Sequence, residues 1–192
     1  MKKKMLFSLL LVVIGYSSFS QLQRGNVLVG GEISNFKLDL GEGRNFQMTI
    51  NPKAAWFFQD NLAAGPYLNL GLSTAKGIGT DISYGLGVFS RYYFNREQVN
   101  LLRHTRLFFE GNIGVEGFNP DQGDNTNGLG LGIGPGVAYF ITPNIGLEAL
   151  VKYNGIVGFG SSPTSDLLNF NIGFQIYLPS AKLRERANEP KN

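Results

Sequence analysis

Hydrophobic and polar residues alternate over a long stretch of the chain, residues 46–72, with the period of a β-strand. Every second residue of Phe46–Phe58 is apolar, whereas most of the residues between them are polar. Because strand side chains point alternately to opposite faces, this pattern predicts a strand. The alternation resumes over Leu62–Leu72 after the polar residues Gln59–Asn61, so the stretch predicts an antiparallel hairpin with a tight turn.

The same alternation recurs along the chain and predicts eight strands. About a dozen residues is long for a soluble domain, where five or six are usual. At ~3.3 Å per residue and a ~45° tilt, such a strand rises about 28 Å, close to the thickness of the hydrocarbon layer of a membrane. The predicted strands are Asn26–Lys37, Phe46–Phe58, Leu62–Leu72, Ile82–Phe94, Arg106–Glu116, Leu129–Tyr139, Ile145–Asn154 and Leu168–Leu178.

These strands predict an all-β fold, an eight-stranded antiparallel up-and-down transmembrane β-barrel. The even number of strands fits bacterial barrels, and closure is required because lipid cannot satisfy the backbone of an open sheet edge. Polar and glycine-containing segments connect the strands: Leu38–Asn45, Gln59–Asn61, Ala75–Thr80, Asn95–His104, Asn119–Asn127, Thr142–Asn144 and Gly155–Ser165.

Aromatic residues gather at the ends of alternate strands and predict a girdle at one rim. Amphipathic rings prefer the level of the lipid headgroups. Two tight turns lie at the same rim, and since short turns mark the periplasmic side, we expect this rim and both chain ends to face the periplasm. Asn95–His104 is long for such a turn. The predicted girdle is Trp56, Phe58, Tyr92, Phe94 and Tyr139.

The opposite face of the strands carries glycines and charged residues and is predicted to face the lumen. Charged residues on the lipid face would cost about 2–4 kcal/mol each for Lys or Arg at mid-bilayer. Arg91 and Glu110 are expected at similar heights on neighbouring strands, and Glu148 and Lys152 lie along one strand. The predicted lumen network is Glu32, Lys53, Arg91, Arg106, Glu110, Glu116, Glu148 and Lys152.

Two interpretations of this network remain open, a polar constriction that passes small solutes and a salt-bridged plug. The plug is favoured because the interior of an eight-stranded barrel is just wide enough to be filled by its own side chains.

The first 20 residues have the anatomy of a secretory signal peptide. Three lysines precede the apolar run Met5–Ile14, and small residues prepare a cleavage site between Ser20 and Gln21. Without Lys2, Lys3 and Lys4, the 17 basic residues fall to 14 and equal the 14 acidic ones, so charge gives no reason to expect nucleic acid as a partner. The predicted division is signal peptide 1–20, barrel 21–178 and a short polar tail 179–192.

Residues 21–178 resemble the small outer-membrane β-barrel proteins of Gram-negative bacteria, of the OmpX and OmpA-barrel type, grouped as a porin family or outer-membrane β-barrel domain. The resemblance rests on the repeated strands and on local sequence such as WFFQDNLAAGPYLNLGL, a strand, an Asp-Asn turn and a leucine-rich strand. The last strand, Ile172–Leu178, looks like the signal that the barrel-assembly machinery reads. It departs from that pattern at Ile172, where a polar residue is common, and in being followed by a tail.

Enzymatic function finds little support in the sequence, although some small outer-membrane barrels modify lipid. His104 is the single histidine and falls in a periplasmic connection, away from Ser161, Ser162 and Ser165. Asp121 and Asp124 lack the spacing of a calcium loop, and the chain has no cysteine for disulfides or thiolate metal sites. We therefore predict no cofactor and no catalytic or metal site.

The sequence thus predicts a bacterial outer-membrane protein with a mostly filled lumen and a structural or surface-interaction role in the cell envelope. A narrow porin-like channel for small solutes is the alternative, and a lipid-modifying enzyme is a weaker one. Expected partners are outer-membrane lipid and, during biogenesis, the barrel-assembly machinery; any surface ligand is unidentified. A soluble lipocalin-like barrel would instead have apolar residues inside, placing Leu68 and Ile133 at its centre and Glu110 on its exterior.

Overall fold

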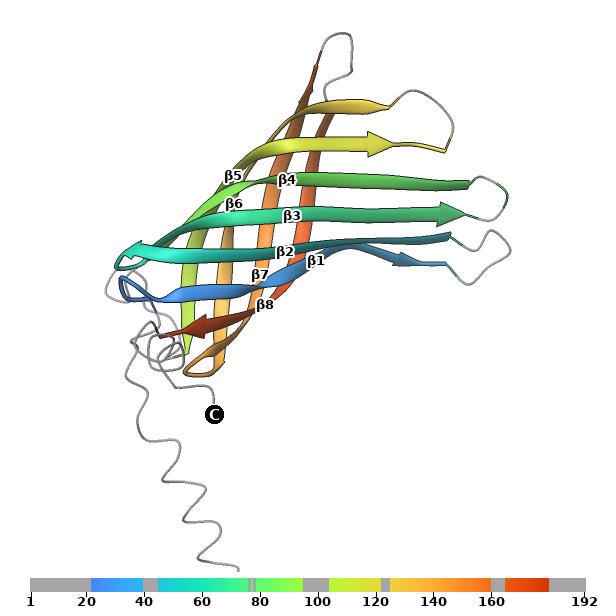
Figure 1. The fold of residues 1–192 in the computed structure, drawn as a ribbon. Helices are drawn as coiled ribbons and strands as arrows, with labels where there is room; N and C mark the ends of the chain where they lie inside the picture. Colours follow the sequence, from blue (N-terminus) through green and yellow to red (C-terminus); the bar gives the residue numbers. More distant parts are fainter. Residues whose placement is uncertain are drawn as a thin grey trace, which may run out of the picture.

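The computed structural model describes residues 22–39, 45–75, 77, 79–94, 104–121, 125–159 and 165–179. In these residues eight long strands form a closed barrel, in which each pairs with its sequence neighbours and the last pairs with the first (Figure 1). All eight pairings are antiparallel, which confirms the predicted up-and-down fold. The strands are β1 (Val27–Leu38), β2 (Asn45–Gln59), β3 (Leu62–Ala75), β4 (Gly79–Tyr93), β5 (Thr105–Asn119), β6 (Thr126–Thr142), β7 (Ile145–Gly158) and β8 (Ser165–Leu178).

No helix in the described ranges is long and apolar enough to cross a membrane.

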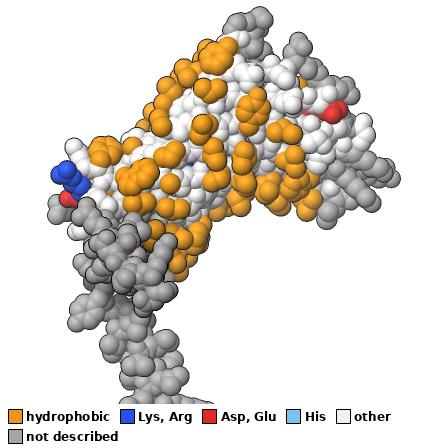
Figure 2. Space-filling model, in the orientation of Figure 1, with side chains coloured by type: hydrophobic (Ala, Val, Ile, Leu, Met, Phe, Trp, Pro, Cys, Tyr) orange, Lys and Arg blue, Asp and Glu red, His pale blue; other side chains and the backbone are white. Residues whose placement is uncertain are grey.

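Apolar side chains cover the outside of the barrel. Leu68, Ile133 and Phe170 are 42%, 52% and 59% exposed, whereas Glu110 is fully buried. On the face shown in Figure 2, hydrophobic side chains spread over the wall and the coloured charged side chains lie near the ends. The barrel therefore has the polarity predicted for a surface facing lipid, opposite to that of a soluble barrel with an apolar centre.

Several strands are longer than their alternation suggested. Gly155–Gly158, predicted as the start of a loop, belongs to β7, and β6 begins at Thr126 inside a predicted loop. These turn-forming residues are held by pairing with their neighbours; Gly155, for example, lies opposite Leu131 on one side and Asp166 on the other. Backbone pairing across the sheet thus outweighs the local preference for a turn.

The two ends of the barrel differ in their connections. Asp60–Asn61 and Pro143–Asn144 join strands at what we call the turn end. At the opposite end, the loop end, β1 is followed by β2, β3 by β4, β5 by β6 and β7 by β8 (Figure 1). Asn61 has a φ of 64°, in the left-handed region that asparagine tolerates better than most residues. The predicted connection 95–104 also belongs to the turn end, but residues 95–103 lie outside the described part of the chain.

The segment before β1 is built into the turn end. The Leu22 carbonyl accepts a hydrogen bond from Asn61 N at 2.7 Å, and Gly25 N donates to the Phe57 carbonyl at 2.7 Å. The Leu22 side chain is buried. The predicted signal peptide, residues 1–20, and all of the predicted tail except Pro179 lie outside the described residues.

Outward aromatic residues form two bands. Trp56, Phe58, Tyr92 and Tyr139 are exposed and Phe94 is half-exposed near the turn end, where the girdle was predicted. A second set that the sequence analysis did not single out faces outward towards the loop end: Phe36, Phe46, Tyr84, Tyr153, Phe159 and Phe170. Tyr84 and Tyr92 are eight residues apart on β4, which corresponds to about 20 Å along the membrane normal, near the ~25 Å of an apolar band between girdles.

This arrangement predicts a depth-dependent cost for a charge on the outer wall. Val88 is 56% exposed and lies midway between Tyr84 and Tyr92. In lipid vesicles, Val88→Arg is expected to lower the free energy of unfolding by about 2–4 kcal/mol, because the guanidinium would face hydrocarbon. The matched change Ile141→Arg, at the turn-end rim, is expected to cost only about 0–1 kcal/mol. Urea titration followed by Trp56 fluorescence measures both, and equal costs would contradict a bilayer around this wall.

Candidate functional site

Six of the eight charged residues predicted for the lumen meet in one cluster, which we call the ion cluster. They come from five strands and are all buried. Three are carboxylates and three are cations, so the formal charges of the group cancel. Its members are Glu32, Lys53, Arg91, Glu110, Glu148 and Lys152.

Arg91 lies at the centre of the ion cluster and is fully buried. Its Cα partner on β5 is Glu110, and its Nε and Nη2 both donate to Glu110 Oε2, at 2.9 and 2.6 Å. Nη1 donates to both oxygens of Glu148, at 2.8 and 2.7 Å, and Nη2 reaches Glu32 Oε1 at 3.2 Å. A guanidinium presents five N–H donors in a fixed fork, which suits one cation to three carboxylates.

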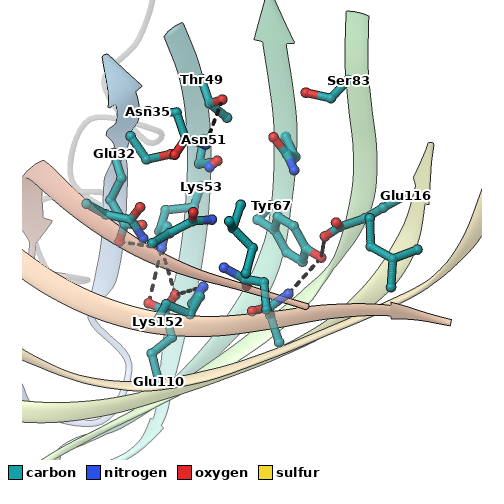
Figure 3. A pocket seen from close by; sticks show the side chains of 18 residues that line it. Glu32, Asn35, Thr49, Asn51, Lys53, Tyr67, Ser83, Glu110, Glu116 and Lys152 are labelled. Atoms are coloured by element: carbon teal, nitrogen blue, oxygen red, sulfur yellow. Dashed lines mark hydrogen bonds and ion pairs between the residues drawn. The ribbon is translucent and has the colours of Figure 1, made fainter. Parts of the chain in front are cut away.

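The two lysines of the cluster contact the carboxylates of Glu32 and Glu110 (Figure 3). Lys53 Nζ lies 2.6 Å from Glu32 Oε1 and 2.9 Å from Glu110 Oε1, and Lys152 Nζ lies 2.7 Å from Glu110 Oε1. Lys152 and Glu148 share β7, but their ion pairs in the described residues reach across the lumen, Lys152 to Glu110 and Glu148 to Arg91.

Arg106 and Glu116 are also buried but stand apart from the ion cluster. Arg106 lies towards the turn end, where its Nη1 donates to the Thr105 carbonyl at 3.0 Å. Glu116 lies on the loop-end side and accepts a hydrogen bond from Tyr67 Oη at 3.0 Å; Asn112 Nδ2 donates to the same hydroxyl at 2.9 Å. The lumen network predicted as one set is thus divided along the barrel axis.

Glycines lie opposite the glutamates of the cluster on neighbouring strands. Gly173 is the Cα partner of both Glu32 on β1 and Glu148 on β7, and Gly134 is that of Glu110. A Cβ at Gly173 would come within 2.9 Å of Glu32 Cγ, and one at Gly134 would meet the Val151 carbonyl. Gly173 on β8 therefore leaves room for a long ionic side chain, whereas Gly134 on β6 lies against the backbone of β7.

Aromatic rings fill the lumen between the ion cluster and the turn end. These rings alternate with the outward girdle along the strands, a position that the sequence analysis left without a role. Tyr93 Oη and Tyr177 Oη lie 2.8 Å apart, Tyr177 Oη donates to Glu148 Oε1 at 2.7 Å, and the Arg91 guanidinium stacks 4.0 Å from the centre of the Phe108 ring. The buried rings on this side of the cluster are Phe57, Tyr93, Phe108, Phe140 and Tyr177. Phe89, also buried, lies beside the cluster, with Lys53 Nζ 4.8 Å from the centre of its ring.

A polar cavity of about 170 Å³ extends from the ion cluster towards the loop end (Figure 3). Seven of its lining residues are asparagines from six strands. Five of them have a buried carbonyl oxygen without a hydrogen-bond partner among the described residues: Asn51, Asn69, Asn112, Asn169 and Asn171. Sequence analysis singled out only glycines and charges on this face, yet these asparagines share it by strand parity.

Within the described residues, no three His, Asp or Glu side chains form a group suited to a metal ion. His104 lies at the turn end, with its ring 6.5 Å from that of Tyr139. Ser161 and Ser162 lie outside the described residues, and the side chain of Ser165 is not described. The absence of a catalytic, cofactor or metal site stays a prediction.

The fold is that of the small eight-stranded outer-membrane barrels, which confirms the resemblance at the level of architecture. The chain is similar to Neisserial surface protein A, with 17% identity, a TM-score of 0.50, and 80% of this chain and 95% of that chain covered. Similarity extends to two proteins of Pseudomonas aeruginosa, each covering 81% of this chain and 97% of the other. These are the N-terminal β-barrel domain of OprF, with 14% identity and a TM-score of 0.51, and the outer membrane protein OprG, with 11% and 0.52.

No protein-family model matches the sequence, and no curated protein matches it. At these identities the likeness to solved structures establishes the fold alone.

The geometry of the ion cluster predicts strong coupling between Arg91 and Glu148. Arg91→Met is expected to lower the free energy of unfolding by about 3–5 kcal/mol, because it leaves buried carboxylates in excess. In the double variant with Glu148→Gln, one cation and one carboxylate are lost together, so the total cost should fall well below the sum of the two single costs. A double-mutant cycle by urea unfolding measures this coupling; additive costs would contradict it.

Proposed function

We propose that this protein is an integral barrel of the bacterial outer membrane whose lumen is closed, with a structural or surface-interaction role in the envelope. The apolar outer wall and its two aromatic bands support the membrane location, because a soluble protein rarely exposes an apolar surface of that size. The observation that carries the closed lumen is the succession of the ion cluster and the aromatic rings, both buried, along one half of the barrel axis.

The role of the ion cluster in this proposal is to seal the barrel. Arg91 and Glu110 are fully buried, and each makes several charge-assisted hydrogen bonds. Moving these side chains aside to admit a solute would be costly, because breaking a buried ion pair leaves an uncompensated charge. Between the cluster and the turn end, the rings of Phe57, Tyr93 and Tyr177 occupy the lumen.

A narrow channel for small solutes is the second candidate, and the polar cavity favours it. The loop-end half of the lumen is lined by amides and charged groups of the kind that line water-filled pores. In this alternative, the ion cluster would be a constriction rather than a seal.

Conductance separates the two candidates. After reconstitution into planar bilayers, the wild-type barrel is expected to give no stable single-channel steps, because cluster and rings fill the cross-section. A general porin measured in the same bilayers controls for insertion. Stable steps that change when Glu110 is replaced by Gln would overturn the sealed lumen and favour the channel.

The proposed topology places the turn end in the periplasm and the loop end outside the cell, since short turns mark the periplasmic side. The chain has no cysteine, so single cysteines can be introduced at Asn125, at the loop end, and at Gln59, at the turn end. A membrane-impermeant maleimide applied to whole cells is expected to label Asn125→Cys and to label Gln59→Cys only after the outer membrane is opened. The reverse pattern would invert the topology, and recovery of the protein outside the outer-membrane fraction would contradict the location.

A further inference from the structure

The polar cavity has the composition of a binding site rather than of packing. At about 170 Å³ it exceeds more than tenfold the ~10–15 Å³ that one water needs. Its floor is the ion cluster, and it reaches Ser83 on β4 and Leu167 on β8, close to the loop-end termini of their strands. It is a one-sided pocket if the lumen is sealed, and the same pocket would lie in the path of a channel.

The wall of the cavity is rich in amides whose hydrogen bonds are incomplete. Asn171 is 4% exposed, and its carbonyl oxygen has no hydrogen-bond partner among the described residues. The carbonyl oxygen of Asn112 also has no partner there, although the NH₂ group of Asn112 donates to Tyr67 Oη. Leaving a buried acceptor unpaired is costly. An amide offers two donors and an acceptor and can turn over to exchange them, so a wall of amides suits a ligand whose groups both donate and accept.

Four of the five charged residues that line the cavity are already held in ion pairs, and Glu116 is the fifth. Lys53 and Lys152 each contact carboxylates of the ion cluster, whose three cations and three carboxylates cancel. Glu116, the remaining charged residue of the lining, accepts a hydrogen bond from Tyr67 and has no ion-pair partner in the part of the chain that is described. An anionic ligand would have to displace an existing pair or lie near the Glu116 carboxylate. A cationic ligand could pair with Glu116 but would share the cavity with the ammonium groups of Lys53 and Lys152, whereas an uncharged ligand meets neither repulsion.

We infer that this cavity binds a small uncharged polyhydroxylated molecule, of the size of a single sugar ring or cyclic polyol, through the amides of Asn112 and Asn171 and their neighbours. Each hydroxyl donates and accepts one or more hydrogen bonds, which matches the two-way capacity of the amide wall. Binding needs only the cavity, so it does not depend on whether the lumen conducts.

Nuclear magnetic resonance of the ¹⁵N-labelled full chain tests this inference. The barrel is held in lauryldimethylamine oxide micelles, because a sugar-based detergent would compete for the site. D-glucose, D-galactose and myo-inositol are titrated in turn while the side-chain NH₂ signals of the asparagines are followed. At least one of the three is expected to shift the Asn112 and Asn171 signals saturably, and Asn112→Leu and Asn171→Leu, which keep the side-chain volume, are each expected to weaken binding about tenfold.

Asn125→Leu is the matched control, since Asn125 is exposed and does not line the cavity; it should leave affinity unchanged. D-glucosamine and D-glucuronate, the cationic and anionic analogues, are expected to bind more weakly than D-glucose. No saturable shift with any of the three neutral probes would overturn the inference, a result that needs no variant to fold. Tighter binding of either charged analogue, or equal loss in the Asn125 variant, would also overturn it.

Discussion

The structure depends on the pairing of β1 with β8, which closes the sheet on itself. An open edge would leave a row of backbone N–H and C=O groups without partners, and lipid supplies none. Eight residue pairs from Val27–Leu178 to Ser34–Asn171 remove that edge. Closure with eight strands also fixes the width of the barrel, and hence the space that inward side chains must fill.

That narrow interior explains why large and small residues are paired across it. Each glutamate of the ion cluster lies opposite a glycine on a neighbouring strand, Glu32 and Glu148 sharing Gly173 and Glu110 facing Gly134. A row of glycines along β6 would otherwise weaken a strand. Here their lack of a side chain leaves room for inward neighbours, since a Cβ at Gly130 would meet Glu116 and one at Gly136 would meet the Phe108 ring.

Strand parity predicted most of this architecture from sequence, because the period of two places each residue inside or outside once a single face is known. It put the charged residues on the inner face and Leu68 and Ile133 on the outer one. Strand parity also places Tyr93 and Asn171 on the inner face. The sequence analysis assigned them no role, because it considered only the charged residues and the aromatic residues of the rim. The contacts of Arg91 with Glu148 and Glu32 could not be predicted, since they cross the lumen between strands that are not neighbours and depend on the stagger and tilt of the closed barrel.

The ion cluster has a consequence for how such a chain reaches its final state. Its six members come from β1, β2, β4, β5 and β7. Among the ion pairs of the described residues, Lys53–Glu32 and Arg91–Glu110 join neighbouring strands, and the other four join strands that are not neighbours. A sheet that has curled only part of the way lacks the pairs that cross the lumen, such as Arg91 with Glu148 and Lys53 with Glu110. Closure of the barrel therefore brings the final backbone pairs together with the ion pairs that join opposite walls of the interior.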